Sequence, residues 1–193
     1  QDAVENTYTL TEQDVGRRIS VIVSYNGKSN TSSSTEMITK GDGTKDNPYL
    51  VATAEQLNTY VRNNPSLHYK QIEDISLSGY NWQPLPAFSG VYDGNNFTIS
   101  NLTINLPGKD RVGLFSELSS GGQLMNIGLE NANVTGKNKT GILVGYAKSP
   151  INDCYVKGNV SGHGNVGGLV GHLIGSTIKN CNATVTVTGS ETV

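Results

Sequence analysis

The acidic side chains of this 193-residue chain are the residues that could most directly perform chemistry. Hydrolysis of a glycosidic bond needs two carboxyl groups roughly 5–10 Å apart on one surface. No two candidates recur as a pair with a spacing that catalysis would require, and some of them stand in expected turns. The sequence therefore predicts no catalytic residues, although seven carboxylates are candidates for the role: Glu73, Asp74, Asp93, Asp110, Glu117, Glu130 and Asp153.

Metal ligands and activated nucleophiles form no recognisable motif. The patterns HExxH, CxxC and GxSxG are all absent, so no metal and no cofactor is predicted. Oxygen atoms of Asp42, Asp46 and Asn47 could form part of a calcium site. Lys45 and the lack of a bidentate glutamate argue against such a site, and a tight turn is the favoured interpretation.

A group of aromatic residues offers a candidate binding site. Tyr80, Asn81 and Trp82 are consecutive, and Tyr92 follows after a short loop. Exposed aromatic rings beside asparagine can stack on sugars, because binding clefts combine apolar faces with polar groups. The alternative is a plug of aromatic side chains that seals the first part of the fold, and the usual burial of large apolar residues favours it.

A repeat dominates the second half of the chain. VGLFS (112–116), GILVG (141–145) and VGGLVG (166–171) are versions of one phrase, and each is followed by a second phrase at a fixed period. Such a period indicates stacked structural units with one inward-facing ladder per position. We expect three ladders, formed by Leu114, Leu143 and Leu169, by Ile127, Cys154 and Cys181, and by Val134, Val160 and Val187.

About five coils are expected between residues 68 and 193. For an earlier coil, Ile99 is aligned with Leu124, and Leu102 and Ile104 with Ile127 and Leu129. The last coil, ATVTVTGSETV, ends without a capping element, which predicts further coils downstream in the natural protein.

The two cysteines occupy the same repeat position, so Cys154 and Cys181 should lie on adjacent strands about 4.8 Å apart. Two buried thiols that act as small apolar residues are the favoured interpretation. A disulfide between neighbouring coils remains an alternative, although it would be strained.

Two further elements precede the repeats. Residues 1–40 carry a turn at 14–16, alternating apolar residues, an Asn26-Gly27 hairpin signal and a short strand at 34–38. A single helix should begin at Thr53, whose sequence fits a capping box, and end before Pro65. Its apolar face is expected to cover the open end of the repeats.

Bulk composition excludes several classes of function. The net charge is −2, so no basic field attracts nucleic acid, and no apolar run approaches the roughly 20 residues that span a bilayer. Glycine is abundant, with 23 residues, and strong helix-forming runs are scarce. This composition favours an all-β fold with many turns.

Several stretches of the chain resemble known families. GDGTKDNPYLVATAEQLNTYVRNN, FSGVYDGNNFTISNLTI and the GLFS, LVG and GGLVG phrases are similar to the GLUG-repeat regions of bacterial surface and secreted proteins. These regions occur in immunoglobulin-A protease precursors and filamentous-haemagglutinin-like adhesins. The resemblance covers residues 41–193 and implies a right-handed parallel β-helix with an N-terminal capping helix. The stretch DVGRRISVIV resembles the C-terminal half of a bacterial immunoglobulin-like repeat, truncated in residues 1–40.

The resemblance implies an extracellular or cell-surface segment without enzymatic activity, which acts as a stalk, display or adhesion module. Host or environmental glycans and matrix proteins are its expected partners, beside neighbouring domains of the parent chain. The alternative is a carbohydrate-binding or polysaccharide-cleaving β-helix, with Trp82, Tyr80, Asn81 and Tyr92 as binding residues. A buried Trp82 and scattered carboxylates would count against that alternative.

Overall fold

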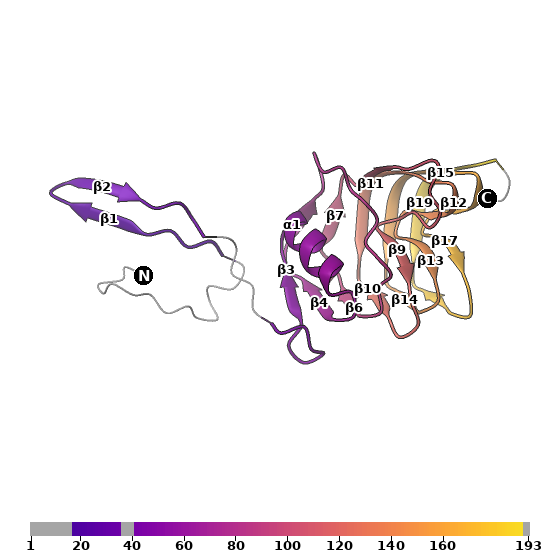
Figure 1. Ribbon diagram of the computed structural model, residues 1–193, viewed down its shortest axis with the longest axis horizontal. Coiled ribbons are helices and arrows are strands. Elements are labelled where there is room, and N and C mark those ends of the chain that lie inside the picture. Colours follow the sequence, from indigo (N-terminus) through magenta and orange to yellow (C-terminus); the bar gives the residue numbers. More distant parts are fainter. Residues whose placement is uncertain (1–16, 36–40, 191–193) are drawn as a thin grey trace. The chain divides into compact units, whose positions relative to one another are not determined.

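The computed structural model describes residues 17–35 and 41–190 of the chain. The chain divides into two compact units, Gln1–Lys40 and Gly41–Val193. The second unit is a stack of parallel β coils with a short helix at its N-terminal end (Figure 1). It is a β-solenoid of about five turns, which confirms the predicted fold class.

The described part of the first unit is a hairpin. Strands β1 (Ile22–Tyr25) and β2 (Lys28–Thr31) are antiparallel and are joined by Asn26 and Gly27. Both turn residues have left-handed backbone angles, with φ of 48° and 72°, as the two-residue Asn-Gly hairpin turn requires. The predicted turn at 14–16 and most of the predicted strand at 34–38 lie outside the described residues.

The helix begins where the sequence predicts. The Thr53 hydroxyl accepts a hydrogen bond from the Gln56 N–H at 3.2 Å, and the Gln56 side chain accepts one from the Ala52 N–H at 2.8 Å. The short helix α1 (Ala54–Gln56) continues as a π-helical segment, η2 (Leu57–Val61). Leu57 and Val61 are fully buried, so this element covers the end of the stack.

Three parallel sheets run along the solenoid. The first sheet lies below the helix in Figure 1 and contains β3 (Tyr49–Val51), β4 (His68–Gln71), β6 (Val91–Asp93), β10 (Gln123–Met125), β14 (Ile151–Asn152) and β18 (Ile178–Lys179). The second contains β5 (Ile75–Ser76), β7 (Thr98–Ser100), β8 (Thr103–Asn105), β11 (Gly128–Thr135), β15 (Tyr155–Gly162) and β19 (Asn182–Gly189).

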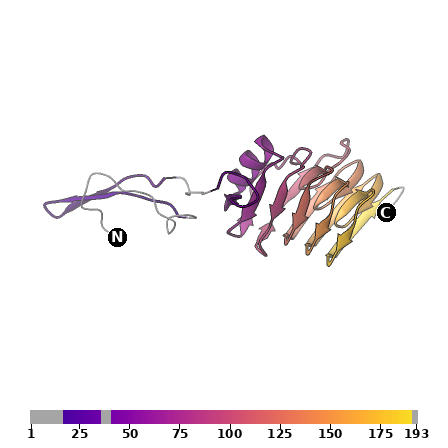
Figure 2. The same cartoon turned by 90° about the horizontal axis from the view of Figure 1, so that it is seen from below.

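The third sheet is shorter and follows the repeated glycine-rich phrase. Its strands are β9 (Phe115–Leu118), β13 (Val144–Ala147) and β17 (Val170–Leu173), and single bridges from Leu85 and Phe88 extend it to an earlier coil. A separate parallel pair, β12 (Asn138–Gly141) and β16 (Gly164–Gly167), lies just before it in each repeat. Figure 2 shows the successive coils of the second unit side by side, in chain order.

Aromatic side chains fill the first coils, where the helix meets the stack. Tyr69 stacks on Tyr49 and on Tyr92 with ring centroids 6.0 and 6.4 Å apart, and Tyr92 meets Phe115 edge-on. The single O–H of the buried Tyr69 side chain is shared between the carbonyl oxygens of Tyr60 and Asn64, at 2.9 and 2.8 Å. Because both carbonyls belong to the helical segment and the residues that follow it, this hydroxyl ties the cap to the first coil.

The structure corrects the alignment of the coil that holds Ile99. In the parallel register Tyr92 pairs with Leu124, and Ile99 pairs with Leu129, so the predicted match of Ile99 with Leu124 is wrong. The segment between Tyr92 and Ile99 turns a corner at Gly94–Asn96, where Asn95 and Asn96 adopt left-handed backbone angles. Matching apolar residues between coils does not reveal Tyr92 as a member of the inward ladder, because the coils differ in length.

Leu143 offers a test of the packed interior, because it is completely buried between neighbouring coils. Truncation to alanine leaves a cavity that the stacked coils cannot close, so we expect Leu143→Ala to lower the free energy of unfolding by roughly 2–5 kcal/mol. Denaturant unfolding measures the change. Ile174→Ala is the control, because Ile174 is 50% exposed and its loss should cost little. Equal effects of the two substitutions would contradict a ladder-packed core.

Candidate functional site

The carboxylates considered for catalysis serve structural roles on separate faces. Asp93, Glu130 and Glu117 belong to strands of the first, second and third sheets, respectively. Six of the seven candidates accept hydrogen bonds from other segments: Asp74 from the Thr98 N–H, Asp93 from Asn126, Asp110 from the Asn138 N–H, Glu117 from Arg111, Glu130 from Lys157 and Asp153 from Asn180. This arrangement stabilises corners and coil contacts.

Within the described residues, no group of three His, Cys, Asp or Glu side chains could hold a metal ion. In the segment considered as a calcium site, Asp42 accepts a hydrogen bond from the Thr44 N–H at 3.0 Å, which closes a turn. The bonds from Thr44 lower the pKa of Asp42, because they favour the charged carboxylate. Among the same residues, no helix has the length and apolar character needed to cross a membrane.

The aromatic candidates do not form one exposed surface. Trp82 is 3% exposed, whereas its neighbour Tyr80 is 44% exposed and Asn81 is also exposed. The side chains of Tyr80 and Trp82 meet edge-on, with ring centroids 6.4 Å apart. A hollow of about 320 Å³ lies beside them, and it is lined by Asn58, Arg62, Tyr80, Asn81, Trp82 and Gln83.

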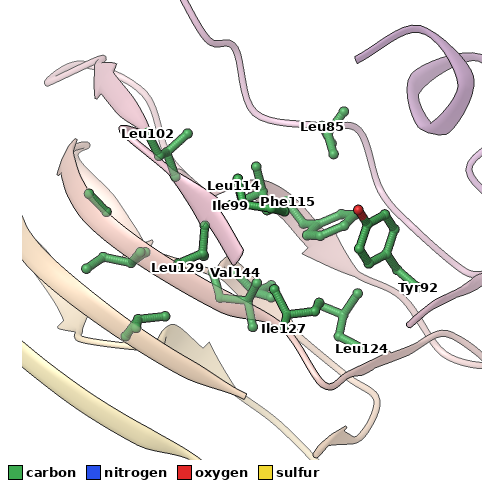
Figure 3. Close-up of a cluster of buried hydrophobic side chains, with 14 of the residues drawn as sticks. Leu85, Tyr92, Ile99, Leu102, Leu114, Phe115, Leu124, Ile127, Leu129 and Val144 are labelled. Carbon is green, nitrogen blue, oxygen red and sulfur yellow. The ribbon is translucent and has the colours of Figure 1, made fainter. Parts of the chain in front are cut away.

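Tyr92 is wrongly placed among the predicted binding residues. It is fully buried, and its hydroxyl donates a hydrogen bond to the Gln71 side chain at 3.1 Å. Burial also raises its pKa well above the ordinary value. Figure 3 shows Tyr92 beside Phe115 in the interior. The aromatic plug is therefore the correct interpretation for Tyr92, because its strand register turns it inward.

The predicted ladder residues lie in register on successive strands. Val134 pairs with Val160 and Val160 with Val187, and hydrogen bonds connect the Leu114, Leu143 and Leu169 positions between coils. The ladder side chains are almost fully buried in the middle of the stack, and they are more exposed in the last coil. The sulfur of Cys181, which is partly exposed, accepts a hydrogen bond from the Cys154 N–H at 3.4 Å.

Both cysteines are free thiols, so the disulfide alternative does not hold in this structure. Burial raises the pKa of the Cys154 thiol to about 12, which keeps it protonated and unreactive at neutral pH.

A cluster of cations around Tyr146 is the most unusual polar feature of the described residues. The ring centroid of Tyr146 lies 4.9 Å from the Arg111 guanidinium carbon, 4.8 Å from the Lys139 Nζ and 5.1 Å from the Lys148 Nζ. His172 packs against the same ring, with the ring centroids 5.5 Å apart. Each cation over an aromatic face is attracted by the ring's negative quadrupole.

Glu117 is the carboxylate that is ion-paired within this cluster. It is 8% exposed and bonds to Arg111 at 2.5 Å and to Lys148 at 3.0 Å. Burial raises the pKa of Glu117, but the hydrogen bond and charge of Lys148 and the charge of Arg111 outweigh it. The net pKa lies below the ordinary value, so Glu117 is ionised at neutral pH.

The segments that carry Arg111 and Lys139 pass close to the third sheet, and Lys139 lies in β12. Arg111 and Lys139 precede equivalent strands and both have left-handed backbone angles, with φ of 58° and 57°. Gly145 makes this approach possible, since a β-carbon there would lie 2.4 Å from the carbonyl carbon of Arg111. A β-carbon at Gly171 would likewise lie 2.4 Å from the carbonyl carbon of Lys139. The repeated glycines therefore let each loop contact the strand behind it.

Two more lysines extend the cluster along the corner. Lys109 and Lys137 are exposed, and the Lys137 N–H donates to the Lys109 carbonyl on the neighbouring coil. Sequence reasoning missed this cluster, although the tripeptides KDR (109–111) and KNK (137–139) stand at the same repeat position and could have revealed it. We call the five cations the basic corner: Lys109, Arg111, Lys137, Lys139 and Lys148.

The fold and the repeat define the class of this chain. It is a parallel β-solenoid, and its residues 162–188 match the family model of the GLUG motif, which confirms the GLUG repeats predicted from the sequence. A solved structure described as "a putative immunoglobulin A1 protease from Bacteroides ovatus" aligns with a TM-score of 0.57 and 18% identity. The alignment covers 79% of this chain and 65% of that chain, and at this identity it shows a shared fold.

Two relatives are similar in sequence. Halomucin of Haloquadratum walsbyi is 37% identical over an alignment of 146 residues, and the alignment covers 68% of this chain and 2% of halomucin. A "putative Gly-rich membrane protein" of Evansella cellulosilytica is 33% identical over an alignment of 107 residues, and the alignment covers 49% of this chain and 12% of that protein. The chain thus spans only a small part of the length of either relative.

The close approach at Gly145 can be tested directly. A β-carbon at this position would overlap the Arg111 backbone, so we expect Gly145→Ala to destabilise the protein by about 1–3 kcal/mol and to move the loop that carries Arg111. Gly108→Ala is the control, because a β-carbon there would meet no atom within 4 Å. Thermal unfolding of both variants measures the difference, and a neutral Gly145→Ala would contradict the described loop.

Glu117 should make stability depend on acid pH. Its pKa in the folded protein lies below the ordinary 4.5, so its ion pairs stabilise the fold above that pH and are lost as the pH falls through the folded value. Glu117→Gln should cost about 1 kcal/mol at neutral pH, because both partner cations are partly exposed. Unfolding curves between about pH 3 and pH 6 should show a smaller pH dependence in the variant than in the wild type. Identical pH dependence would refute the ion-pair assignment.

Proposed function

We propose that this chain is a non-catalytic structural segment of a large surface protein, and that it acts as a stiff spacer that displays neighbouring parts of its parent. The observation that carries the proposal is the continuous interior: apolar side chains are stacked in register from the helix to the last coils. Such a solenoid grows in length with each added coil, because each coil contacts only its neighbours, and this suits a spacer.

The relatives support the surface location. One is named halomucin and the other a Gly-rich membrane protein, and this chain corresponds to a small part of each. The GLUG match agrees with the same class of protein. The fold resembles a structure described as a protease, but a shared fold does not carry a mechanism.

A carbohydrate-binding role is a second candidate, and the hollow beside Tyr80 favours it. Tyr80 and Asn81 are exposed there and could contact a sugar ring, whereas the burial of Trp82 removes the largest expected stacking surface. Polysaccharide cleavage has less support. The candidate carboxylates that lie on strands, Asp93, Glu130 and Glu117, belong to three different sheets.

Surface display predicts that antibodies against residues 41–193 label intact cells that make the parent protein. The expected result is equal labelling of intact and permeabilised cells, because the solenoid would lie outside the membrane. Flow cytometry measures it, and an antibody to a cytoplasmic protein controls for lysis. Labelling that needs permeabilisation would overturn the proposed location.

A further inference from the structure

We propose that the basic corner is a binding site for an acidic polysaccharide, one that carries carboxylate or sulfate groups at regular intervals. The inference rests on the proposed function in one respect, namely that the solenoid is exposed to the extracellular medium. It differs from the sugar site considered beside Tyr80, because it uses charge and not ring stacking as the main contact.

The basic corner carries an uncompensated local charge. It holds five cations, and the acidic groups bound within it are Glu117 and Asp110, so the local net charge is positive while the whole chain carries −2. The single negative charge of Glu117 neutralises only part of the combined positive charge of Arg111 and Lys148. No ion pair joins Lys139 to a carboxylate among the residues that the structure describes. An incoming anion would relieve the mutual repulsion of these cations.

Arg111 and Lys139 are held in place before any ligand arrives. Hydrogen bonds between coils fix the backbone around them, from the Arg111 N–H to the Asn138 carbonyl and from the Val112 N–H to the Lys139 carbonyl. The ring of Tyr146 holds the Arg111 and Lys139 head groups within 5 Å of its centroid, at 4.9 and 4.8 Å. Less side-chain freedom is therefore lost on binding.

The arrangement of the cations favours a polymeric ligand. Lys109 and Lys137 lie on adjacent coils, and so do Arg111 and Lys139, so the cations form two short rows. Adjacent coils lie about 4.8 Å apart, so the two side chains of each row project from backbone positions that are close to each other. A flexible polymer with anionic groups along its length can contact several of these cations at once, whereas a single small anion reaches only one or two.

Single-stranded nucleic acid fits this surface less well than an acidic polysaccharide. Proteins that bind single strands combine cations with aromatic rings on which bases stack. The aromatic ring at the centre of the corner, Tyr146, is already surrounded by three cations and His172. Arginine and lysine contacts to sulfate or carboxylate need no such platform.

Direct binding measurements on the purified chain test the proposal. Heparin supplies sulfate groups, polygalacturonate supplies carboxylates, and neutral dextran is the negative control. We expect binding to at least one acidic polymer, and roughly tenfold weaker binding for the double variant Lys137→Gln/Lys139→Gln, which corresponds to about 1.4 kcal/mol. Both substitutions leave the Glu117 ion pairs intact, so the fold should be preserved, and circular dichroism checks this.

Lys179→Gln is the matched control, because Lys179 is exposed on β18 of the first sheet, away from the corner. It should bind like the wild type. Affinity should also fall as salt is added, because exposed charges are screened. Binding to neither acidic polymer, or equal losses in the Lys179 variant and the double variant, would refute the site.

Two further measurements distinguish the polysaccharide site from a general polyanion surface and from the hollow beside Tyr80. Double-stranded DNA that binds as tightly as heparin, with the same loss in the double variant, would identify a general polyanion surface and overturn the choice of polysaccharide. A loss of binding in Tyr80→Ala but not in the double variant would move the site to the hollow.

Surface labelling is independent of these measurements, so failure of glycan binding leaves the spacer function standing, and failure of labelling leaves any measured binding intact.

Discussion

The parallel register between coils is the constraint on which the rest of the structure depends. Each strand offers one set of backbone groups to the coil before it and one to the coil after it, so equivalent residues of successive coils must face the same way. Because Val134 faces the interior, its register partners Val160 and Val187 must face the interior as well. Burial of each ladder stabilises its register, because a shift by one residue would turn apolar side chains to water.

The same constraint produces the polar surface. When an inward ladder is fixed, the residues between its members form outward ladders, and Glu117, Tyr146 and His172 are one such row on the third sheet. The segments before these strands then pass the row at close range, and only glycine at positions 145 and 171 leaves room for them. The close approach of these cations to Tyr146 is thus a consequence of the repeat.

The sequence could predict the coils because a fixed period and alternating apolar residues report directly on stacking. It could also predict the Asn26-Gly27 hairpin and the capping threonine, because these depend on local chemistry. Tyr92 was misassigned because its coil contains a different number of residues from the later ones, so only the three-dimensional register shows that it pairs with Leu124. The sequence did not reveal the basic corner, because its members come from separate segments and two of them, Arg111 and Lys139, adopt left-handed backbone angles although they are not glycines.

A solenoid of this kind separates stability from recognition. The energy that holds the coils together lies in ladders such as Leu114, Leu143 and Leu169, which no ligand can reach. Outward positions contribute little to that core, so charge can accumulate on one corner while the fold remains the same. Glu117 differs from the other outward residues, because it is buried among the cations and keeps two of them in place. A stiff spacer can therefore acquire a binding surface through changes in a few loop residues, without any change in its interior.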